Sequence, residues 1–95
     1  AIHGLPDDAV IEINCIVDAQ GAHPLTFGPL PEPMQALTQQ VKAYERLTIE
    51  AAVHGDRRSG LLALIANPLV GNANLAQPLL EEVLTINAPY LPQFR

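Results

Sequence analysis

Apolar and polar residues alternate near the start of this chain. The odd positions from Ala9 to Val17 are all apolar, whereas the even positions include Glu12 and Asn14. A period of two is typical of a β-strand with one apolar face, because successive side chains of a strand point to opposite sides. The pattern therefore predicts a strand near residues 9–17.

A turn and a return strand are expected next. Residues 18–21 read Asp-Ala-Gln-Gly and can reverse the chain, because Gly21 adopts left-handed backbone conformations without strain. The short run at 25–27 would form the second strand, which Pro24 confines to a sheet edge. We therefore expect residues 1–28 to hold a β-hairpin, a structure that is marginal in water on its own.

A helical period replaces the alternation after a proline-rich connector. Apolar residues recur at three- and four-residue steps and predict a helix near 33–54, and a second apolar edge in its later turns indicates neighbours on two sides. Two further helices are expected near 57–66 and 75–88, where leucine-rich faces repeat. The first stripe is formed by Met34, Leu37, Val41, Tyr44, Leu47 and Ala51, and the second edge by Ile49, Ala52 and Val53.

Local signals predict where these helices begin and end. Gly55 suits a helix C-terminus, Asp56 suits the N-cap of the second helix, and Asn67, which precedes a proline, suits its end. Asn74, with Gln77 three residues later, resembles a capping box for the third helix.

Pro89 and Pro92 cannot continue a helix, so the tail after residue 88 is expected to be extended. The fold class predicted from these patterns is α+β. A hairpin in residues 1–28 precedes three helices in residues 33–95, and the whole chain 1–95 forms a single segment.

Composition excludes several classes of partner. The 95 residues are 48% hydrophobic but only 4% aromatic, which indicates one small domain with an aliphatic core. A net charge of −5 and an isoelectric point near 4.9 oppose binding to nucleic acid or to anionic membranes. No apolar run reaches the roughly 18 residues of a membrane span. The single cysteine excludes an internal disulfide and is typical of a reducing compartment, so a cytoplasmic protein is expected.

Cysteine and histidine are the first candidates for chemistry. Cys15 lies on the apolar face of the predicted strand, where we expect a buried and unreactive thiol rather than a nucleophile. His3, His23 and His54 show no metal-ligand spacing. His54 falls in the last turn of a helix, which favours a capping role, whereas His23 follows the hairpin turn and could reach a cleft or another subunit.

The acidic residues are better explained as turn and surface residues than as catalytic pairs. Asp7 and Asp8 are neighbours that would point to opposite faces of a strand, so they cannot readily share one substrate atom. Arg46 and Glu50 lie four residues apart and form an ordinary exposed pair worth about 0.3 kcal/mol. Exposed helix faces account for Glu45, Glu50, Glu81 and Glu82.

Arg57 and Arg58 are less easily explained. Both follow the expected cap in the first turn of a helix, where the helix dipole disfavours positive charge. We expect a carboxylate, such as that of Glu50, or a neighbouring subunit to hold them, and a sugar phosphate remains an alternative because guanidinium groups suit phosphate oxygens. No catalytic, cofactor-binding or metal-binding residue is assigned.

Three segments carry a resemblance to a known family. They are GLPDDAVIEINC at 4–15, QQVKAYERLTIEAAVHGDRRSGLLALIANPLV at 39–70 and YLPQF at 90–94. In this order and spacing they resemble the last stretch of glycoside hydrolase family 4, and they are most similar to its 6-phospho-β-glucosidases. The resemblance implies the end of a C-terminal domain like that of lactate and malate dehydrogenases.

The resemblance also implies a chemistry that this chain does not carry alone. Enzymes of the family use NAD to oxidise the sugar at C3, a tyrosine to remove the C2 proton, and a divalent metal, typically manganese, to stabilise the developing charge; the two-carboxylate route of most glycosidases does not apply to them. Their metal-binding cysteine belongs to an upstream part of the family pattern, so Cys15 is not that ligand. The strand–GxGxxG–helix unit that would bind a dinucleotide is absent from these residues.

Two hypotheses from different classes follow. In the first, the chain is the C-terminal structural and assembly part of the second domain of a 6-phospho-β-glucosidase, inactive by itself, whose partners are the N-terminal dinucleotide-binding domain of the same parent chain and further copies in a homo-oligomer. In the second, it is a free-standing helical interaction module. A start at Ala1 without methionine favours the first. A small independent hydrolase would rest only on Cys15 and scattered histidines.

Overall fold

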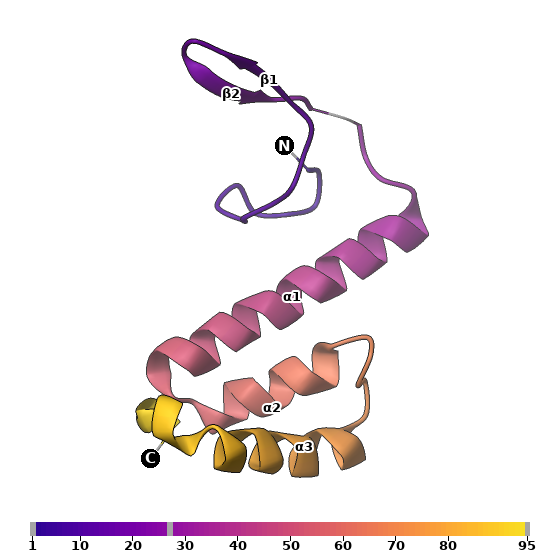
Figure 1. The fold of residues 1–95 in the computed structure, drawn as a ribbon. Helices are drawn as coiled ribbons and strands as arrows, with labels where there is room; N and C mark the ends of the chain where they lie inside the picture. Colours follow the sequence, from indigo (N-terminus) through magenta and orange to yellow (C-terminus); the bar gives the residue numbers. More distant parts are fainter. Residues whose placement is uncertain (1, 27, 95) are drawn as a thin grey trace. The chain divides into compact units, whose positions relative to one another are not determined.

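The computed structural model describes residues 2–26 and 28–94 and shows a hairpin followed by three helices, as the sequence predicts (Figure 1). Backbone contacts divide the chain into two compact units, Ala1–Gln39 and Gln40–Arg95, and the boundary falls inside the first helix. The elements in order are β1 (Cys15–Asp18), β2 (Gly21–Pro24), α1 (Glu32–His54), α2 (Arg57–Ala66), α3 (Ala73–Ile86) and two 3₁₀ turns, η1 (Ala88–Tyr90) and η2 (Pro92–Phe94).

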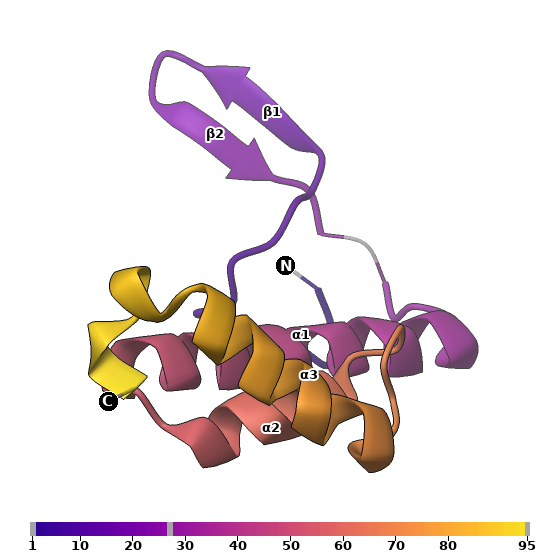
Figure 2. The same cartoon turned by 60° about the horizontal axis from the view of Figure 1, so that its bottom comes forward.

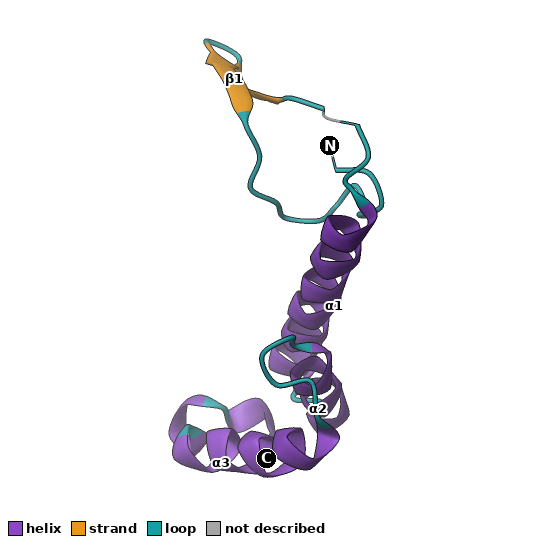
Figure 3. Ribbon diagram, turned by 90° about the vertical axis from the view of Figure 1, so that its right-hand side faces the viewer, coloured by secondary structure: helices purple, strands orange, loops and turns teal. Residues whose placement is uncertain are grey.

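The hairpin of the first unit is shorter than predicted and shifted along the chain. β1 and β2 pair antiparallel around a two-residue turn, with Asp18 opposite Gly21 and Cys15 opposite Pro24. Figure 3 shows the strands of this hairpin in orange. The predicted bounds 9–17 and 25–27 are therefore wrong, although the turn is in the expected place. Residue 27 lies outside the described residues.

The register explains the difference. A two-residue turn makes the residues that directly flank it a pair, so the return strand begins at Gly21, where φ is +115°. Pro24 has no N–H to extend the ladder, and one further bond, from the Leu25 N–H to the Asn14 carbonyl (3.0 Å), follows it. Residues 9–14 are irregular rather than part of a strand.

The ends of α1 and α2 agree with the local signals. Gly55 follows α1 with φ at +66°, and its N–H donates to the Ala51 carbonyl at 2.8 Å. Asp56 caps α2, and Asn67 ends it with an extended backbone, because the next residue is a proline. The second edge of α1 is only partly covered: Ile49 and Val53 are exposed, whereas Ala52 lies against the tail, where Gln93 bonds its carbonyl.

The start of α3 and the tail differ from the prediction. Asn72 caps α3, and its Oδ1 accepts from the Asn74 N–H at 2.7 Å. Because Asn72 already satisfies the first donors of the helix, no capping box at Asn74 forms. The tail is not extended but makes two 3₁₀ turns, since Pro89 and Pro92 occupy early positions of these turns, where an N–H is not required.

Small side chains build the core of the second unit, where α2 and α3 lie side by side (Figure 2). At Gly60 a Cβ atom would lie 3.3 Å from Leu80 Cδ1 and 3.7 Å from Ala51 Cβ, so α2 approaches both of its neighbours closely. The buried hydrophobic residues are Ala51, Ala63, Ala76, Leu80 and Leu84. No helix in residues 2–26 and 28–94 combines the length and the apolar composition that crossing a membrane requires.

Candidate functional site

The tail folds back onto the junction of α1 and α2, and we call residues 88–94 the clasp. Gln93 Nε2 donates a hydrogen bond to the Ala52 carbonyl at 2.9 Å. The backbone carbonyl of Gln93 lies against Gly55, where a Cβ atom would fall far inside the 3.0 Å that real Cβ atoms keep. Figure 1 shows the clasp in yellow beside this junction. The clasp therefore needs a glycine at position 55.

The clasp closes one end of an apolar groove in the second unit. The groove has a volume of about 180 Å³. Its one hydroxyl-bearing side chain, Thr48, already donates to the Tyr44 carbonyl at 2.8 Å. Such a lining can hold apolar side chains but offers no acid, base or nucleophile. The lining residues are Thr48, Ala51, Ala52, Gly60, Leu64, Leu80, Val83, Leu84, Leu91 and Phe94.

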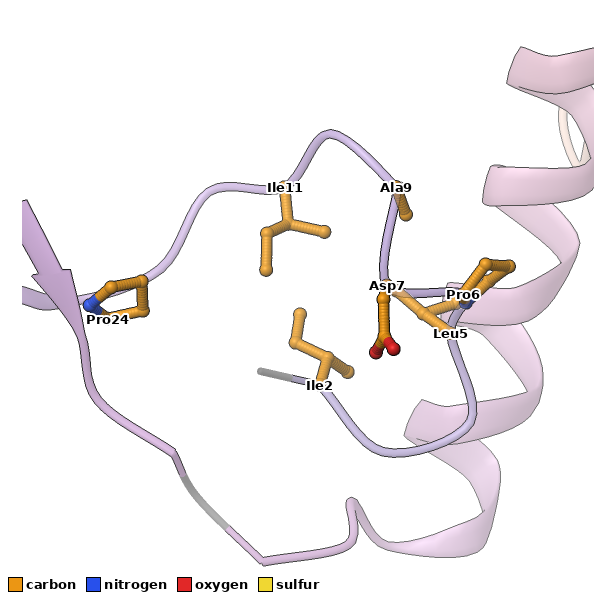
Figure 4. Close-up of a pocket in the computed structure, with 7 residues that line it drawn as sticks. All are labelled: Ile2, Leu5, Pro6, Asp7, Ala9, Ile11 and Pro24. Atoms are coloured by element: carbon orange, nitrogen blue, oxygen red, sulfur yellow. The ribbon is translucent and has the colours of Figure 1, made fainter.

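A second cavity, of about 390 Å³, lies in the first unit (Figure 4). Its lining is mostly apolar, and Asp7 contributes the one acidic side chain drawn there. The Ala9 N–H donates to the Pro6 carbonyl at 3.1 Å, which confirms that this segment is a turn. One carboxylate among apolar residues does not make the pair that glycoside hydrolysis by two carboxylates requires. The lining residues are Ile2, Leu5, Pro6, Asp7, Ala9, Ile11 and Pro24.

Cys15 is exposed, so the predicted burial of its thiol is wrong. The observed β1 carries apolar residues on both faces, Val17 on one and Ile16 on the other. Both faces of the hairpin are open, because every residue of β1 and β2 is exposed. The thiol makes one local contact, a donation to the Ile13 carbonyl at 3.4 Å. Cys15 is thus accessible to reagents in this chain.

The histidines have local roles. His23 Nε2 lies 2.8 Å from Asp18 Oδ1, across the hairpin turn, and the same oxygen accepts from the Gln20 N–H at 2.8 Å. His54 Nε2 lies 3.6 Å from Glu50 Oε1, one helical turn earlier. Among residues 2–26 and 28–94, no three His, Cys, Asp or Glu side chains come close enough together to hold a metal ion. His23 thus stabilises the hairpin turn, and His54 lies near a carboxylate in the last turn of α1.

Arg57 is paired, but not with the expected partner. Its Nη1 donates to both carboxylate oxygens of Glu81 on α3, at 3.0 and 3.3 Å. Both side chains are about half exposed, so the pair contributes about 0.2–1 kcal/mol. Glu50, named as a candidate partner, instead lies near His54. Sequence reasoning missed Glu81 because the contact joins two helices through residues 24 positions apart.

Asp56, the cap of α2, has a shifted pKa. The Ser59 hydroxyl donates to Asp56 Oδ2 at 2.8 Å and the Arg58 N–H donates to Oδ1 at 3.0 Å. The hydrogen bond from Ser59, assisted by backbone N–H groups and by the charge of Arg58, lowers the pKa of Asp56 below its ordinary value of 3.8.

This shift makes the stability of α2 depend on pH. A carboxyl whose folded-state pKa is depressed stabilises the fold above its unfolded pKa, and that contribution is lost as the pH falls through the folded pKa. We expect the thermal midpoint of the native chain to fall, relative to that of an Asp56→Asn variant, as the pH is lowered from about 4, since asparagine keeps the cap without titrating. Circular dichroism melts of the two chains at matched pH check this, and parallel curves would contradict it.

Thiol titration checks the environment of Cys15. Because the thiol is exposed and a disulfide reagent can approach it, we expect Ellman's reagent to modify one thiol per chain in buffer as fast as in denaturant at the same pH. A reaction that is complete only after denaturant is added would show that the hairpin covers the thiol.

Comparison with known proteins identifies the family. The family 4 glycosyl hydrolase C-terminal domain matches residues 1–70. A probable 6-phospho-β-glucosidase of Bacillus subtilis is 44% identical over 99% of this chain and 21% of its own length. The 6-phospho-β-glucosidase BglT of Thermotoga maritima is 40% identical over 96% of this chain and 22% of its own length. The chain thus spans about a fifth of these relatives.

Solved structures share the fold. A 6-phospho-α-glucosidase from gut microorganisms, in complex with NAD and Mn²⁺, superposes with a TM-score of 0.91 at 24% identity, over 99% of this chain and 22% of its own. Another, in complex with NAD and glucose-6-phosphate, has a TM-score of 0.89 at 31% identity over 99% of this chain and 21% of its own. The match to the family's C-terminal domain, the sequence identities and the shared fold agree with one another. The chain therefore belongs to glycosyl hydrolase family 4, as part of its C-terminal domain.

Proposed function

We propose that this chain is the C-terminal structural and assembly portion of an NAD- and divalent-metal-dependent 6-phospho-β-glucosidase, which hydrolyses O-glycosyl bonds of phosphorylated β-glucosides. The observation that carries the proposal is a difference in identity. The two 6-phospho-β-glucosidases are 44% and 40% identical to this chain, whereas the 6-phospho-α-glucosidase with the glucose-6-phosphate complex is 31% identical. The β specificity is therefore favoured over the α specificity.

The residues that the structure describes do not fit the cofactors themselves. The described residues hold no cluster of His, Cys, Asp or Glu suited to a metal, and the sequence contains no glycine-rich phosphate-binding turn. Both cavities are lined mainly by apolar residues. We propose that NAD, manganese and the catalytic residues lie in other parts of the parent enzyme.

Packing is the role that the chain's surfaces support. The open hairpin offers unpaired strand edges to a neighbouring sheet, and the helices expose apolar residues that another part of the enzyme can cover. The partners we propose are the N-terminal dinucleotide-binding domain of the parent chain and further copies in a cytoplasmic homo-oligomer, without nucleic acid or membrane.

The test uses the full-length product of the gene that encodes this chain. With NAD⁺ and Mn²⁺ present, it is expected to release p-nitrophenol from the 6-phosphate of p-nitrophenyl β-glucoside and much more slowly from the α-anomer. The 95-residue chain alone is the matched control and should release none. Release from the α-anomer alone would overturn the β specificity.

A free-standing interaction module is the second candidate, and the many exposed apolar side chains favour it. The intact mass of the native gene product decides between the two. A mass several times 10.2 kDa supports the enzyme, whereas a mass equal to 10.2 kDa contradicts it and leaves the interaction module.

A further inference from the structure

Helix α3 carries two adjoining apolar arcs, and only one of them is buried. Ala76, Leu80 and Leu84 form the buried arc. The other arc, which we call the α3 stripe, is exposed: Leu75 is 59% and Ile86 is 67% exposed, and Leu79 and Val83 lie between them. At about 100° per residue, the two arcs together cover about 180° of the helix without a polar break.

The α3 stripe continues into the apolar groove. Val83 belongs to both, and Thr48 and Ala52 of α1 line the groove with it. The polar side of α3 faces elsewhere, because Glu81 pairs with Arg57 of α2 and Thr85 bonds its own helix at the Glu81 carbonyl. One continuous apolar surface thus runs from the exposed stripe to the core.

We infer that an apolar segment of the parent polypeptide, outside these 95 residues, lies along the α3 stripe and fills the groove; this inference rests on the proposed function. The relatives provide the length for such a segment, because about four fifths of each lies outside the matched part. The same fold, at a TM-score of 0.91, also occurs within a chain of which it makes up 22%.

Two features favour an intramolecular segment over a second copy of this chain. A contact between copies is typically an apolar centre surrounded by a polar rim, but on the groove side the stripe passes directly into buried residues. The apolar face of α3, about 180° wide, is also broader than the stripe of about 100° that a surface helix typically buries. The buried core is also small, three alanines and two leucines, and a covering segment would enlarge it.

The length of the stripe sets the size of its occupant. Leu75 and Ile86 are 11 residues apart, which corresponds to about 16 Å along a helix. A strand of about five residues, or three turns of a helix, has this length. The groove needs an apolar face on that segment, because its lining offers little to a polar side chain.

A Leu75→Asp substitution in the full-length enzyme tests the inference. Position 75 lies in the first turn of α3, where a carboxylate is favourable to the helix dipole, so the 95-residue chain should tolerate the change. If a segment covers Leu75, the substitution should lower the urea midpoint of the full-length enzyme by about 1 M. The shift should be the same at low and at high protein concentration.

Asn74→Asp is the matched control. It adds the same charge in the same helical turn but on the polar side of α3, and we expect it to leave the midpoint of both proteins unchanged. If Leu75→Asp prevents folding of the full-length enzyme, Leu75→Ala replaces it in the test. The reference is then Leu69→Ala, because Leu69 is 94% exposed. If a segment covers Leu75, Leu75→Ala should lower the urea midpoint more than Leu69→Ala does.

Two results would overturn the inference. Equal midpoints for Leu75→Asp and Asn74→Asp in the full-length enzyme would show that the stripe faces solvent. A shift that grows on dilution, with a smaller sedimentation coefficient, would assign the stripe to a second copy. The activity assay tests the proposed function separately. If the full-length protein is inactive but its Leu75→Asp variant shows a concentration-independent shift, the covering segment is supported and the proposed enzymatic function is contradicted.

Discussion

Replacing Gly55 with alanine is expected to remove about 2–5 kcal/mol of stability from the helical unit, through left-handed strain and steric overlap together. Gly55 has φ at +66°, a conformation that L-residues rarely adopt. A Cβ atom there would also collide with the backbone carbonyl of Gln93, which a flexible side chain could avoid but a backbone atom held in the clasp cannot. Urea unfolding followed by circular dichroism measures the loss.

Gly71→Ala is the matched control for this substitution. Gly71 has φ at +56°, but the nearest atom to its added Cβ, the Asn67 carbonyl oxygen, lies at 3.8 Å, an ordinary contact. Gly71→Ala should therefore lower the stability only through left-handed backbone strain, by about 1–2 kcal/mol. If Gly55→Ala and Gly71→Ala destabilise the chain equally, the clasp does not contact the α1–α2 junction.

Leu80→Ala is the second change with a large expected effect. Leu80 is 7% exposed and meets α2 at Gly60. Removing a buried leucine side chain forfeits its transfer free energy and leaves a cavity, which costs about 2–5 kcal/mol. The same measurement, urea unfolding of the 95-residue chain, should show a lower midpoint without a change in slope.

Leu69→Ala gives the reference for this loss. Leu69 is 94% exposed, so the same chemical change there should alter stability by less than about 0.5 kcal/mol. A Leu80→Ala variant as stable as Leu69→Ala would mean that α3 does not pack against α2 as described.

The helices were predictable because the signals that define them are local. The bounds 57–66 of α2 match the prediction, since a cap residue, Asp56, and a proline after Asn67 fix its ends within the sequence itself. α1 begins at Glu32, one residue before the predicted start, and ends at His54 as expected. The existence of these two helices and their ends therefore followed from neighbouring residues.

The strands were less predictable because pairing is not local. A period of two marks which residues could form a strand, but only a partner decides how many of them do. The two-residue turn pairs Cys15–Asp18 with Gly21–Pro24, and the alternation at 9–14 does not form a strand. The exposure of Cys15 follows from the same absence of a covering layer.

The clasp and the Arg57 pair show a third limit. The run YLPQF resembles a family motif, but the sequence could not show that Gln93 reaches Ala52 or that Leu91 and Phe94 line a groove. A carboxylate partner for Arg57 could be expected, and the choice of Glu81 over Glu50 depends on how α2 lies against α3. The sequence thus predicted a carboxylate partner for Arg57, whereas the packing of the helices determined which carboxylate it is.

The bond between Gln93 and Ala52 closes a loop of 41 residues that contains all of α2 and α3. Because α2 packs against α3 and the clasp packs against the α1–α2 junction, we expect the two helices to open together. Their slowest amide protons should therefore exchange with solvent deuterium at a common rate, through one shared opening. A common rate would mean that α2 and α3 form a single cooperative unit, although each alone is too short to be stable in water.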